Sequence, residues 1–257
     1  MKRNFTIPGV DHDLLAQDAA RLMTPVSRRA FLRGSASLGS LVMLTGCNVV
    51  DGASAEALLR AVSRFNDHVQ AALFNPNRLA REFAEADITR PFPFNAFYPQ
   101  KDAPEVEASE WQLTVSGLVE DKRPWTLERL NRLAKETQIT EHICIEGWSA
   151  IGKWSGSRLA HFLELIGADA RAKYVGFRCE DRYSTSLDMA TARHSQTLIA
   201  LQFDGQTLPR AYGFPMKVRV PTKLGFKNPK HVNELFVTND YPGGFWEKQG
   251  YNWFAGL

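Results

Sequence analysis

The chain has 257 residues, of which 44% are hydrophobic, and its 31 basic and 28 acidic side chains give a formal net charge of +3. Six basic and three acidic residues fall among the first 46, so the rest of the chain is close to neutral. A near-neutral chain has no electrostatic basis for binding nucleic acid. The remaining length suits one domain with a substantial core.

The N-terminus carries the pattern of an export signal. Residues 27–33 read Ser-Arg-Arg-Ala-Phe-Leu-Arg, which is typical of a twin-arginine signal. Residues 34–46 fall short of the ~20 residues that span a bilayer, which favours a signal-peptide core. Leu44-Thr45-Gly46-Cys47 fits a lipoprotein cleavage box. We therefore expect a signal over residues 1–46 and a periplasmic protein lipidated at Cys47; a short core helix with two chance arginines is the alternative.

Two segments follow the signal. Apolar residues recur at helical spacing over residues 55–74, which predicts an amphipathic helix. We assign residues 47–90 to a helical linker after the anchor, and residues 91–257 to the main domain. Residues 91–99 contain three prolines and four aromatic rings. Repeated prolines exclude a helix or a central strand, so this is an aromatic loop that either packs on the core or forms part of a site.

Strands predominate in the rest of the chain. Short helices are expected over residues 126–135, capped by Thr126, and over residues 157–166, capped by Ser157 and closed by Gly167. Asp204-Gly205 predicts a tight hairpin turn. Strands are expected over residues 111–119, 139–145, 173–178, 197–203, 216–220 and 231–238. The fold class is therefore α+β with a mixed sheet.

Cys144 lies near the end of the strand predicted over residues 139–145, and the chain has only three cysteines. It could be a buried apolar residue or half of a disulfide with Cys179. It could be a nucleophile with His142 as base, because residues two apart on a strand share a face. It could also be the lone thiolate ligand of a soft metal whose other ligands come from outside the protein. Zinc is poorly supported, because no Cys/His set has ligand spacing.

Several segments resemble, in order, motifs of the sulfite oxidase family, and most closely its exported bacterial branch, which includes periplasmic methionine-sulfoxide reductases. Residues 144–149, Cys-Ile-Glu-Gly-Trp-Ser, are similar to C-x-E-x-W-S, whose cysteine binds molybdenum. Residues 181–186 are similar to a G-Y-x-x-S segment whose tyrosine faces the metal. Residues 213–221 resemble the pterin-binding motif H-G-x-P-[LV]-R-x-x-x-P, and residues 225–230 resemble the motif G-x-K-x-x-K that follows it. Residues 95–98 resemble the reductases' N-N-F-Y segment, and residues 251–254 resemble the family's aromatic tail.

The resemblance implies a sulfite-oxidase-type domain that binds molybdenum–molybdopterin. It implies that Cys144 is the metal ligand and that Tyr183 is a second catalytic residue facing the metal. Lys227 is a candidate for the pterin phosphate, for which charged donors are suited. The cofactor-binding residues that it implies are Asn95, Tyr98, Cys179, Tyr212, Lys217, Asn228 and Lys230.

The chain departs from the family pattern at four positions. Tyr212 stands where the motif has histidine, and Lys217 where it has arginine. A lysine makes a point-charge contact in place of a bidentate fork. Pro99 replaces an acidic residue of the reductases, and Cys179 replaces a hydroxyl residue that lines the cofactor. These departures leave the substrate open.

We expect an exported oxidoreductase that transfers an oxygen atom to or from a small S- or N-oxide. The twin-arginine route carries folded proteins, typically with a cofactor inserted. The chain has no C-x-x-C-H, no G-x-G-x-x-G after a strand and too few cysteines for an iron–sulfur cluster. Its electrons are therefore expected to pass through a membrane haem protein or a cytochrome, with the aromatic run over residues 245–254 as a candidate contact surface and a packed tail as the alternative.

Two other functions stay open. One is a non-catalytic lipoprotein that keeps the fold for binding or assembly, and the other is a metal-free thiol enzyme that uses Cys144 and His142. The resemblance ends shortly after the pterin-binding stretch, without the sandwich domain that makes eukaryotic relatives dimeric. A monomer is therefore expected.

Overall fold

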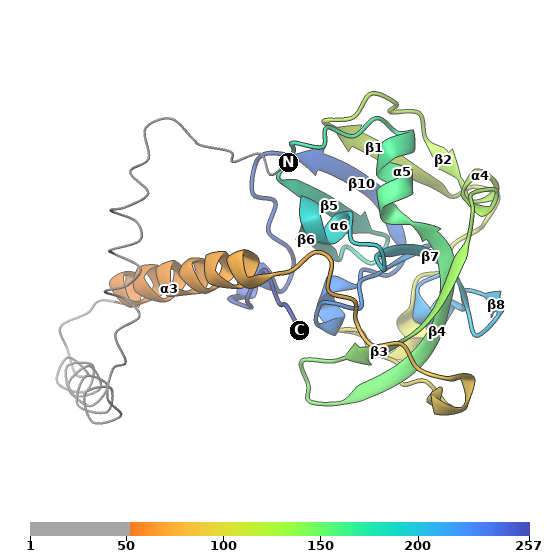
Figure 1. The fold of residues 1–257 in the computed structure, drawn as a ribbon, viewed down its shortest axis with the longest axis horizontal. Coiled ribbons are helices and arrows are strands. Elements are labelled where there is room, and N and C mark those ends of the chain that lie inside the picture. The colour runs from red at the N-terminus through yellow and green to blue at the C-terminus, as the bar shows by residue number, and fades with distance from the viewer. Residues whose placement is uncertain (1–51) are drawn as a thin grey trace, which may run out of the picture. The chain divides into compact units, whose positions relative to one another are not determined.

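The computed structural model describes residues 52–257, which are drawn in colour in Figure 1. The chain divides into two units, residues 1–58 and residues 59–257. The expected export signal, its cleavage box and Cys47 lie outside the described residues. Export and lipidation therefore stay predictions.

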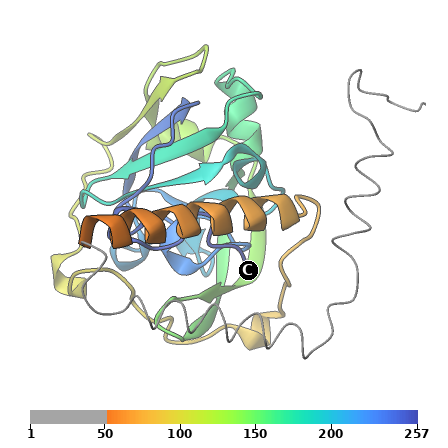
Figure 2. The same cartoon turned by 90° about the vertical axis from the view of Figure 1, so that its left-hand side faces the viewer.

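Helix α3 (Gly52–Leu73) is the first element of the described chain, and Figure 2 shows it as one uninterrupted helix. Its bounds agree with the helix predicted over residues 55–74, so that prediction is confirmed. Among the described residues, no helix has both the length and the apolar character needed to cross a membrane.

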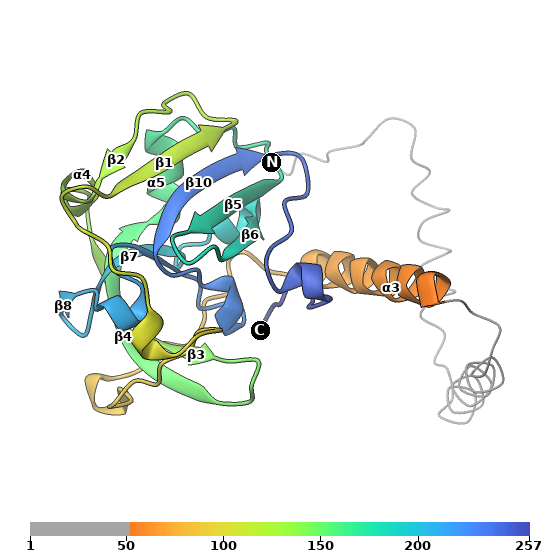
Figure 3. The same cartoon turned by 180° about the vertical axis from the view of Figure 1, so that it is seen from behind.

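One sheet is mixed, as the sequence predicts, and can be followed in Figures 1 and 3. Its strand order is β2-β1-β10-β5-β6. Strands β1 and β10 run parallel, and the other neighbours are antiparallel. The strands are β1 (Gln112–Gly117), β2 (Trp125–Thr126), β5 (Tyr174–Cys179), β6 (Ser184–Asp188) and β10 (Val232–Thr238).

The second sheet holds a long hairpin whose turn contains Cys144. Its order is β3-β4-β7-β8, with β9 paired to β7, and all these pairs are antiparallel. The amide of Cys144 donates to the carbonyl of Trp148 across the turn at 2.9 Å. Gly147 has a φ of +90°, a backbone conformation that glycine adopts without strain. The strands are β3 (Glu136–Ile143), β4 (Ser149–Arg158), β7 (Leu198–Phe203), β8 (Gln206–Thr207) and β9 (Lys217–Arg219).

The helices between the strands are short. Thr126 caps α4 as predicted, because its hydroxyl accepts from the amide of Arg129 at 3.2 Å. Asp204-Gly205 forms the predicted tight turn between β7 and β8. The α-helices are α4 (Leu127–Asn131), α5 (Leu159–Leu165) and α6 (Met189–Ala192). The 3-10 turns are η1 (Glu85–Asp87), η2 (Gln100–Asp102), η3 (Arg210–Tyr212), η4 (Gly225–Lys227) and η5 (Glu247–Gln249).

The predicted cap of the second helix was wrong. Ser157 lies in strand β4, where it pairs with Ile199, and α5 begins only at Leu159. No strand is predicted from the sequence at β4, which is rich in glycine and serine. Strand preference depends on cross-strand packing more than on the residue itself, and β4 is paired on both sides, with β3 and β7.

The described residues form two buried apolar clusters. The larger one contains residues of the mixed sheet, α5 and α6. The smaller one contains Phe92, Trp154 and Phe203, with Trp148 and Tyr212 packed against it. Because Phe92 is buried while Phe94 and Phe97 line a pocket, the aromatic loop both packs on the core and contributes to a candidate site.

Gly156 generates a prediction about stability. A Cβ at this position would lie 1.8 Å from the carbonyl oxygen of Ile199 on the neighbouring strand. We expect Gly156→Ala to lower the free energy of unfolding by about 3 kcal/mol, because the two strands must separate. Gly256→Ala is the matched control, since its nearest contact is a Phe254 ring atom at 3.2 Å. Equal urea midpoints for the two variants would contradict the close approach.

Candidate active site

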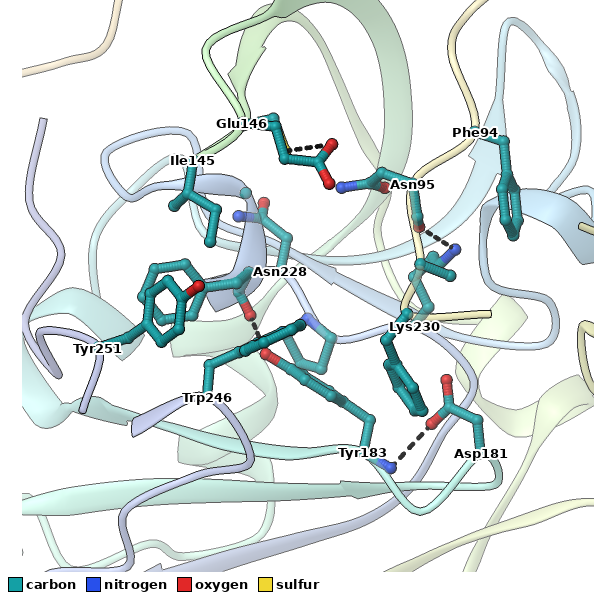
Figure 4. Close-up of a pocket in the computed structure, with 16 residues that line it drawn as sticks. Phe94, Asn95, Ile145, Glu146, Asp181, Tyr183, Asn228, Lys230, Trp246 and Tyr251 are labelled. Carbon is teal, nitrogen blue, oxygen red and sulfur yellow. Dashed lines mark hydrogen bonds between the residues drawn. The ribbon is translucent and has the colours of Figure 1, made fainter. Parts of the chain in front are cut away.

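A pocket of about 470 Å³ brings together segments that are far apart in the sequence. Figure 4 shows Ile145, Tyr251 and Trp246 on one side of it and Asn95 and Lys230 on the other. The lining residues are Phe94, Asn95, Ala96, Phe97, Cys144, Ile145, Glu146, Asp181, Tyr183, Gly225, Phe226, Asn228, Pro229, Lys230, Trp246 and Tyr251.

Cys144 lies in the β3–β4 turn with its side chain in the pocket wall. Both Cys144 and Cys179 are free and buried, so the structure contains no disulfide between them. The Cys144 Sγ lies 3.7 Å from Glu146 Oε2, which also accepts from the indole of Trp148 at 3.0 Å. Burial raises the pKa of the Cys144 thiol. The protein alone therefore favours the neutral thiol over a free thiolate nucleophile.

His142 is not placed as a base for Cys144. Strand β3 ends at Ile143, so the alternation that would put the two side chains on one face stops before Cys144. The His142 Nε2 lies 3.1 Å from the Asn95 Nδ2, and no hydrogen bond joins His142 to Cys144 in the described chain. The pKa of His142 is held well below its usual value by burial first, and then by neighbouring cations. The geometry therefore gives no support to a metal-free thiol enzyme.

Three cations are buried behind and beside the pocket. Lys217, Arg219 and Lys230 are 3%, 0% and 9% exposed. Burial is the main cause that lowers their pKa values, to about 9 for Arg219 and about 8 for Lys230. The pKa of Lys217 is lowered well below its usual value, and the charges of the other two cations contribute to this.

The hydrogen bonds of these three cations go to neutral groups, although the charge of the half-buried Asp181 acts on Lys230. The Arg219 guanidinium donates to the Asn228 side-chain oxygen at 2.7 Å and to the carbonyl oxygen of Glu141 at 2.6 Å. The Lys230 ammonium donates to the carbonyl oxygen of Asn95 at 2.7 Å. The Lys217 ammonium lies 4.9 Å from the centroid of the Trp154 ring.

Within residues 52–257, no carboxylate forms an ion pair with any of the three. A buried charge without a counter-charge is costly. The cluster of Lys217, Arg219 and Lys230, called the cation cluster below, is therefore suited to an anionic ligand.

Tyr183 lies at the pocket but its hydroxyl is already engaged. It donates to the carbonyl oxygen of Phe226 at 2.6 Å, and the Tyr183 amide donates to the Asp181 carboxylate at 3.0 Å (Figure 4). Burial first, and then the charge of Glu247, raises the pKa of Tyr183 well above its usual value. The neutral hydroxyl is bound to the η4 turn, and to donate to a ligand it would have to leave the Phe226 carbonyl.

The structure brings five of the residues singled out from the sequence to the pocket and places four elsewhere. Those that line it are Cys144, Tyr183, Asn95, Asn228 and Lys230. Tyr98 donates to Asp181 at the pocket wall at 2.8 Å, and Cys179 is buried at the end of β5. The Tyr212 hydroxyl donates to the carbonyl oxygen of Phe92 at 2.7 Å, within the smaller apolar cluster. Lys217 lies in the cation cluster.

Lys227 is paired within the protein. Its ammonium lies 2.6 Å from Glu247 Oε1, and both side chains are 1% exposed. The same oxygen accepts from the hydroxyl of Thr185 at 2.8 Å. Lys227 therefore has its counter-charge already, unlike the cation cluster, and its contacts give no support to a role at a phosphate. The pairing has no sequence signal, because Glu247 belongs to no recognised motif.

Three further pocket residues were not singled out as site residues. Ile145 and Asp181 lie within the stretches 144–149 and 181–186 but not at the motif positions, and Trp246 belongs to the aromatic run over residues 245–254. The sequence does indicate that Arg219 accompanies Lys217, because the two residues lie two apart on one strand, where side chains share a face.

Known proteins resemble this chain over most of its length. The family described as oxidoreductase molybdopterin binding domain matches residues 100–246. A protein of Azospira oryzae, provisionally named protein-methionine-sulfoxide reductase subunit YedZ1, is 58% identical over 240 residues, which cover 93% of this chain and 92% of that protein. The protein-methionine-sulfoxide reductase catalytic subunit MsrP of Burkholderia mallei is 29% identical over 247 residues, which cover 85% of this chain and 71% of that protein.

A solved structure shares the fold. The sulfane dehydrogenase SoxCD from Paracoccus pantotrophus superimposes with a TM-score of 0.51 at 18% sequence identity. The match covers 63% of this chain, and this chain spans about half of that one, 51% of its length. At this identity the likeness concerns the fold alone.

The Lys227–Glu247 pair generates a prediction about stability. Glu247→Gln should lower the free energy of unfolding by about 3 kcal/mol, because it leaves a buried ammonium without its counter-charge. The double variant Glu247→Gln/Lys227→Met should recover most of that loss. Glu128→Gln is the matched control, since its pair with Arg132 is exposed. An additive double variant in urea denaturation would show that the two charges are not coupled.

The lowered pKa of Lys230 generates a prediction about pH. The folded value is about 8 and the ordinary value is 10.5, so between these pH values the unfolded chain binds more protons. The stability of the cofactor-free protein should therefore rise with pH across this window, by roughly 3 kcal/mol in total. Urea denaturation of the wild type and of Lys230→Met between pH 7.5 and 10 isolates this contribution. Parallel stability curves for the two proteins would rule it out.

Proposed function

The chain belongs to the sulfite oxidase family of molybdopterin-dependent oxidoreductases, and we propose that it removes an oxygen atom from an S-oxide of the methionine-sulfoxide type at the pocket beside Cys144. The relatives from Azospira and Burkholderia support this substrate class, because both are named as methionine-sulfoxide reductase subunits. The observation that carries the site assignment is a thiol, a cation cluster and a pocket that meet in one place.

The residues present fit the family's cofactor, molybdenum–molybdopterin. Cys144 offers the soft sulfur ligand that molybdenum accepts, and the cation cluster offers the positive charge that the pterin phosphate needs. The amide of Asn228 also holds the η4 turn, because its Nδ2 donates to the carbonyl oxygen of Leu224 at 3.2 Å. When bound, the cofactor supplies two-electron oxygen-atom transfer, while the protein supplies positioning and electrostatics.

The substrate would use the aromatic side of the pocket. The rings of Trp246 and Tyr251 meet edge to face with centroids 5.1 Å apart, and Ile145 lies on the same side (Figure 4). The alkyl groups of a sulfoxide can pack on such rings, as methionine side chains do. The opposite side of the pocket is polar, because it carries Asn95 and the ammonium of Lys230, which belongs to the cation cluster.

We further propose that the protein works in the periplasm and exchanges electrons with a membrane haem protein. The twin-arginine pattern supports the location, and the word "subunit" in the relatives' names supports a partner. Of the aromatic run expected to contact that partner, Trp253 and Phe254 are buried. Tyr251 is 41% exposed and Trp246 is half-buried. A contact surface would therefore use these two residues at the pocket rim, and not the whole aromatic run.

The central test compares the two described cysteines. Cys144→Ser should lower turnover of methionine sulfoxide with a reduced viologen dye by about 100-fold or more, since the thiolate ligand is lost. The buried Cys179→Ser is the matched control and should keep its molybdenum, with only a modest change in kinetics. Molybdenum is measured by mass spectrometry of the purified proteins.

The outcomes separate the parts of the proposal. Wild-type turnover by Cys144→Ser would rule out the thiol ligand. Molybdenum-loaded wild-type protein that reduces no S-oxide would rule out the substrate class and leave the family assignment in place. Full activity without molybdenum would instead favour a thiol enzyme.

A further inference from the structure

Helix α3 exposes its apolar stripe. Leu59, Val62, Phe65, Val69 and Leu73 are 69%, 49%, 66%, 39% and 79% exposed. These residues recur at intervals of three and four, so they share one side of the helix. An amphipathic helix of a globular domain normally turns such a stripe to the core. In this protein the stripe has no cover within the described residues.

A different side of α3 contacts the rest of the domain, and that side is polar. The amide of Phe254 donates to the Asp67 carboxylate at 2.8 Å, and the amide of Gly256 donates to the Gln70 side-chain oxygen at 3.3 Å. Asp67 and Gln70 are half-buried. Because these contacts fix the rotation of the helix about its axis, the domain does not cover the apolar stripe.

The exposed apolar surface continues beyond the end of α3. Leu73 lines a cavity of about 290 Å³ together with Leu79 and Leu257, which are 62% and 56% exposed. Arg78 and Arg81 line the same cavity. An apolar strip bordered by guanidinium groups matches the two layers of a phospholipid surface, acyl chains and anionic headgroups.

The sequence just before α3 indicates which partner covers the stripe. The lipoprotein box ends at Cys47, and only four residues separate Cys47 from Gly52, where α3 begins. Five residue steps span at most roughly 17 Å. If Cys47 carries a diacylglycerol group, the first turn of α3 is held within that distance of a bilayer.

We propose that α3 lies along the surface of a phospholipid bilayer with its apolar stripe, Leu59 to Leu73, inserted among the acyl chains near the headgroups. The helix lies on the bilayer and does not cross it, because no described helix is long and apolar enough to span. It adds an attachment to the one that a diacylglycerol group at Cys47 would supply. The proposal is independent of the reaction that the pocket performs.

A fluorescent label tests the proposal position by position. An environment-sensitive nitrobenzoxadiazole group is attached to Val69→Cys on the stripe, or to the exposed Ala71→Cys on the other side of the helix. Both labelled variants also carry Cys47→Ser, and the remaining Cys144 and Cys179 are buried, so they compete little for the label. The full chain is mixed with vesicles of phosphatidylethanolamine and phosphatidylglycerol. The Val69 label should shift to shorter wavelength and be quenched by spin-labelled lipid, while the Ala71 label should stay in water.

A charge placed on either side of the helix gives a second readout in the chain with Cys47→Ser. Phe65→Glu should weaken vesicle binding by about tenfold or more, equivalent to ~1.4 kcal/mol. Ala71→Glu adds the same charge away from the stripe and should bind as well as its parent, and Phe65→Leu should keep the binding.

Three results would overturn the proposal. One is a Val69 label that stays in water with vesicles present. Another is equal vesicle binding by Phe65→Glu and Ala71→Glu. The third is a Val69 label that becomes buried without lipid as protein concentration rises, which would show that a second copy of the chain covers the stripe.

Discussion

Three buried positive charges that form no ion pair with a carboxylate of residues 52–257 dominate the electrostatics of this site. Lys217 and Arg219 lie on strand β9, and Lys230 reaches the same region from the segment after the η4 turn. Their lowered pKa values reflect the cost of holding them out of water. A bound anion offsets this cost, and the family's cofactor carries a phosphate that can supply the negative charge. The rest of the pocket is arranged around this requirement.

Two separate elements place residues around the pocket. The β3–β4 hairpin ends in a tight turn that holds Cys144 at the pocket wall, while the aromatic loop is held by Phe92 in the smaller apolar cluster. Asn95 then lies between them, with its side chain at His142 and its carbonyl at Lys230. Polar contacts thus join segments that share no strand pairing, and packing fixes the distances among them.

Local patterns predicted much of this from the sequence. Alternating apolar residues gave most strands, and the motif residues Cys144 and Lys230 do meet at one pocket. Local patterns failed where tertiary contacts determine whether a strand forms or which partner a side chain binds. Strand β4 forms because it is paired on both sides, and Lys227 finds Glu247 across a loop. Tyr212 lies in the smaller apolar cluster, held by the carbonyl of Phe92, and no residue pattern specifies that contact.

Lys217 offers the most direct measurement of the central claim that the cation cluster exists for an anionic cofactor. Lys217→Met should raise the free energy of unfolding of the cofactor-free protein by about 1–3 kcal/mol, because it removes a buried, uncompensated charge. The same variant should retain less molybdopterin after purification. Opposite effects on stability and on cofactor content are the predicted result. A variant that loses stability without its cofactor and keeps a full molybdopterin content would contradict the account.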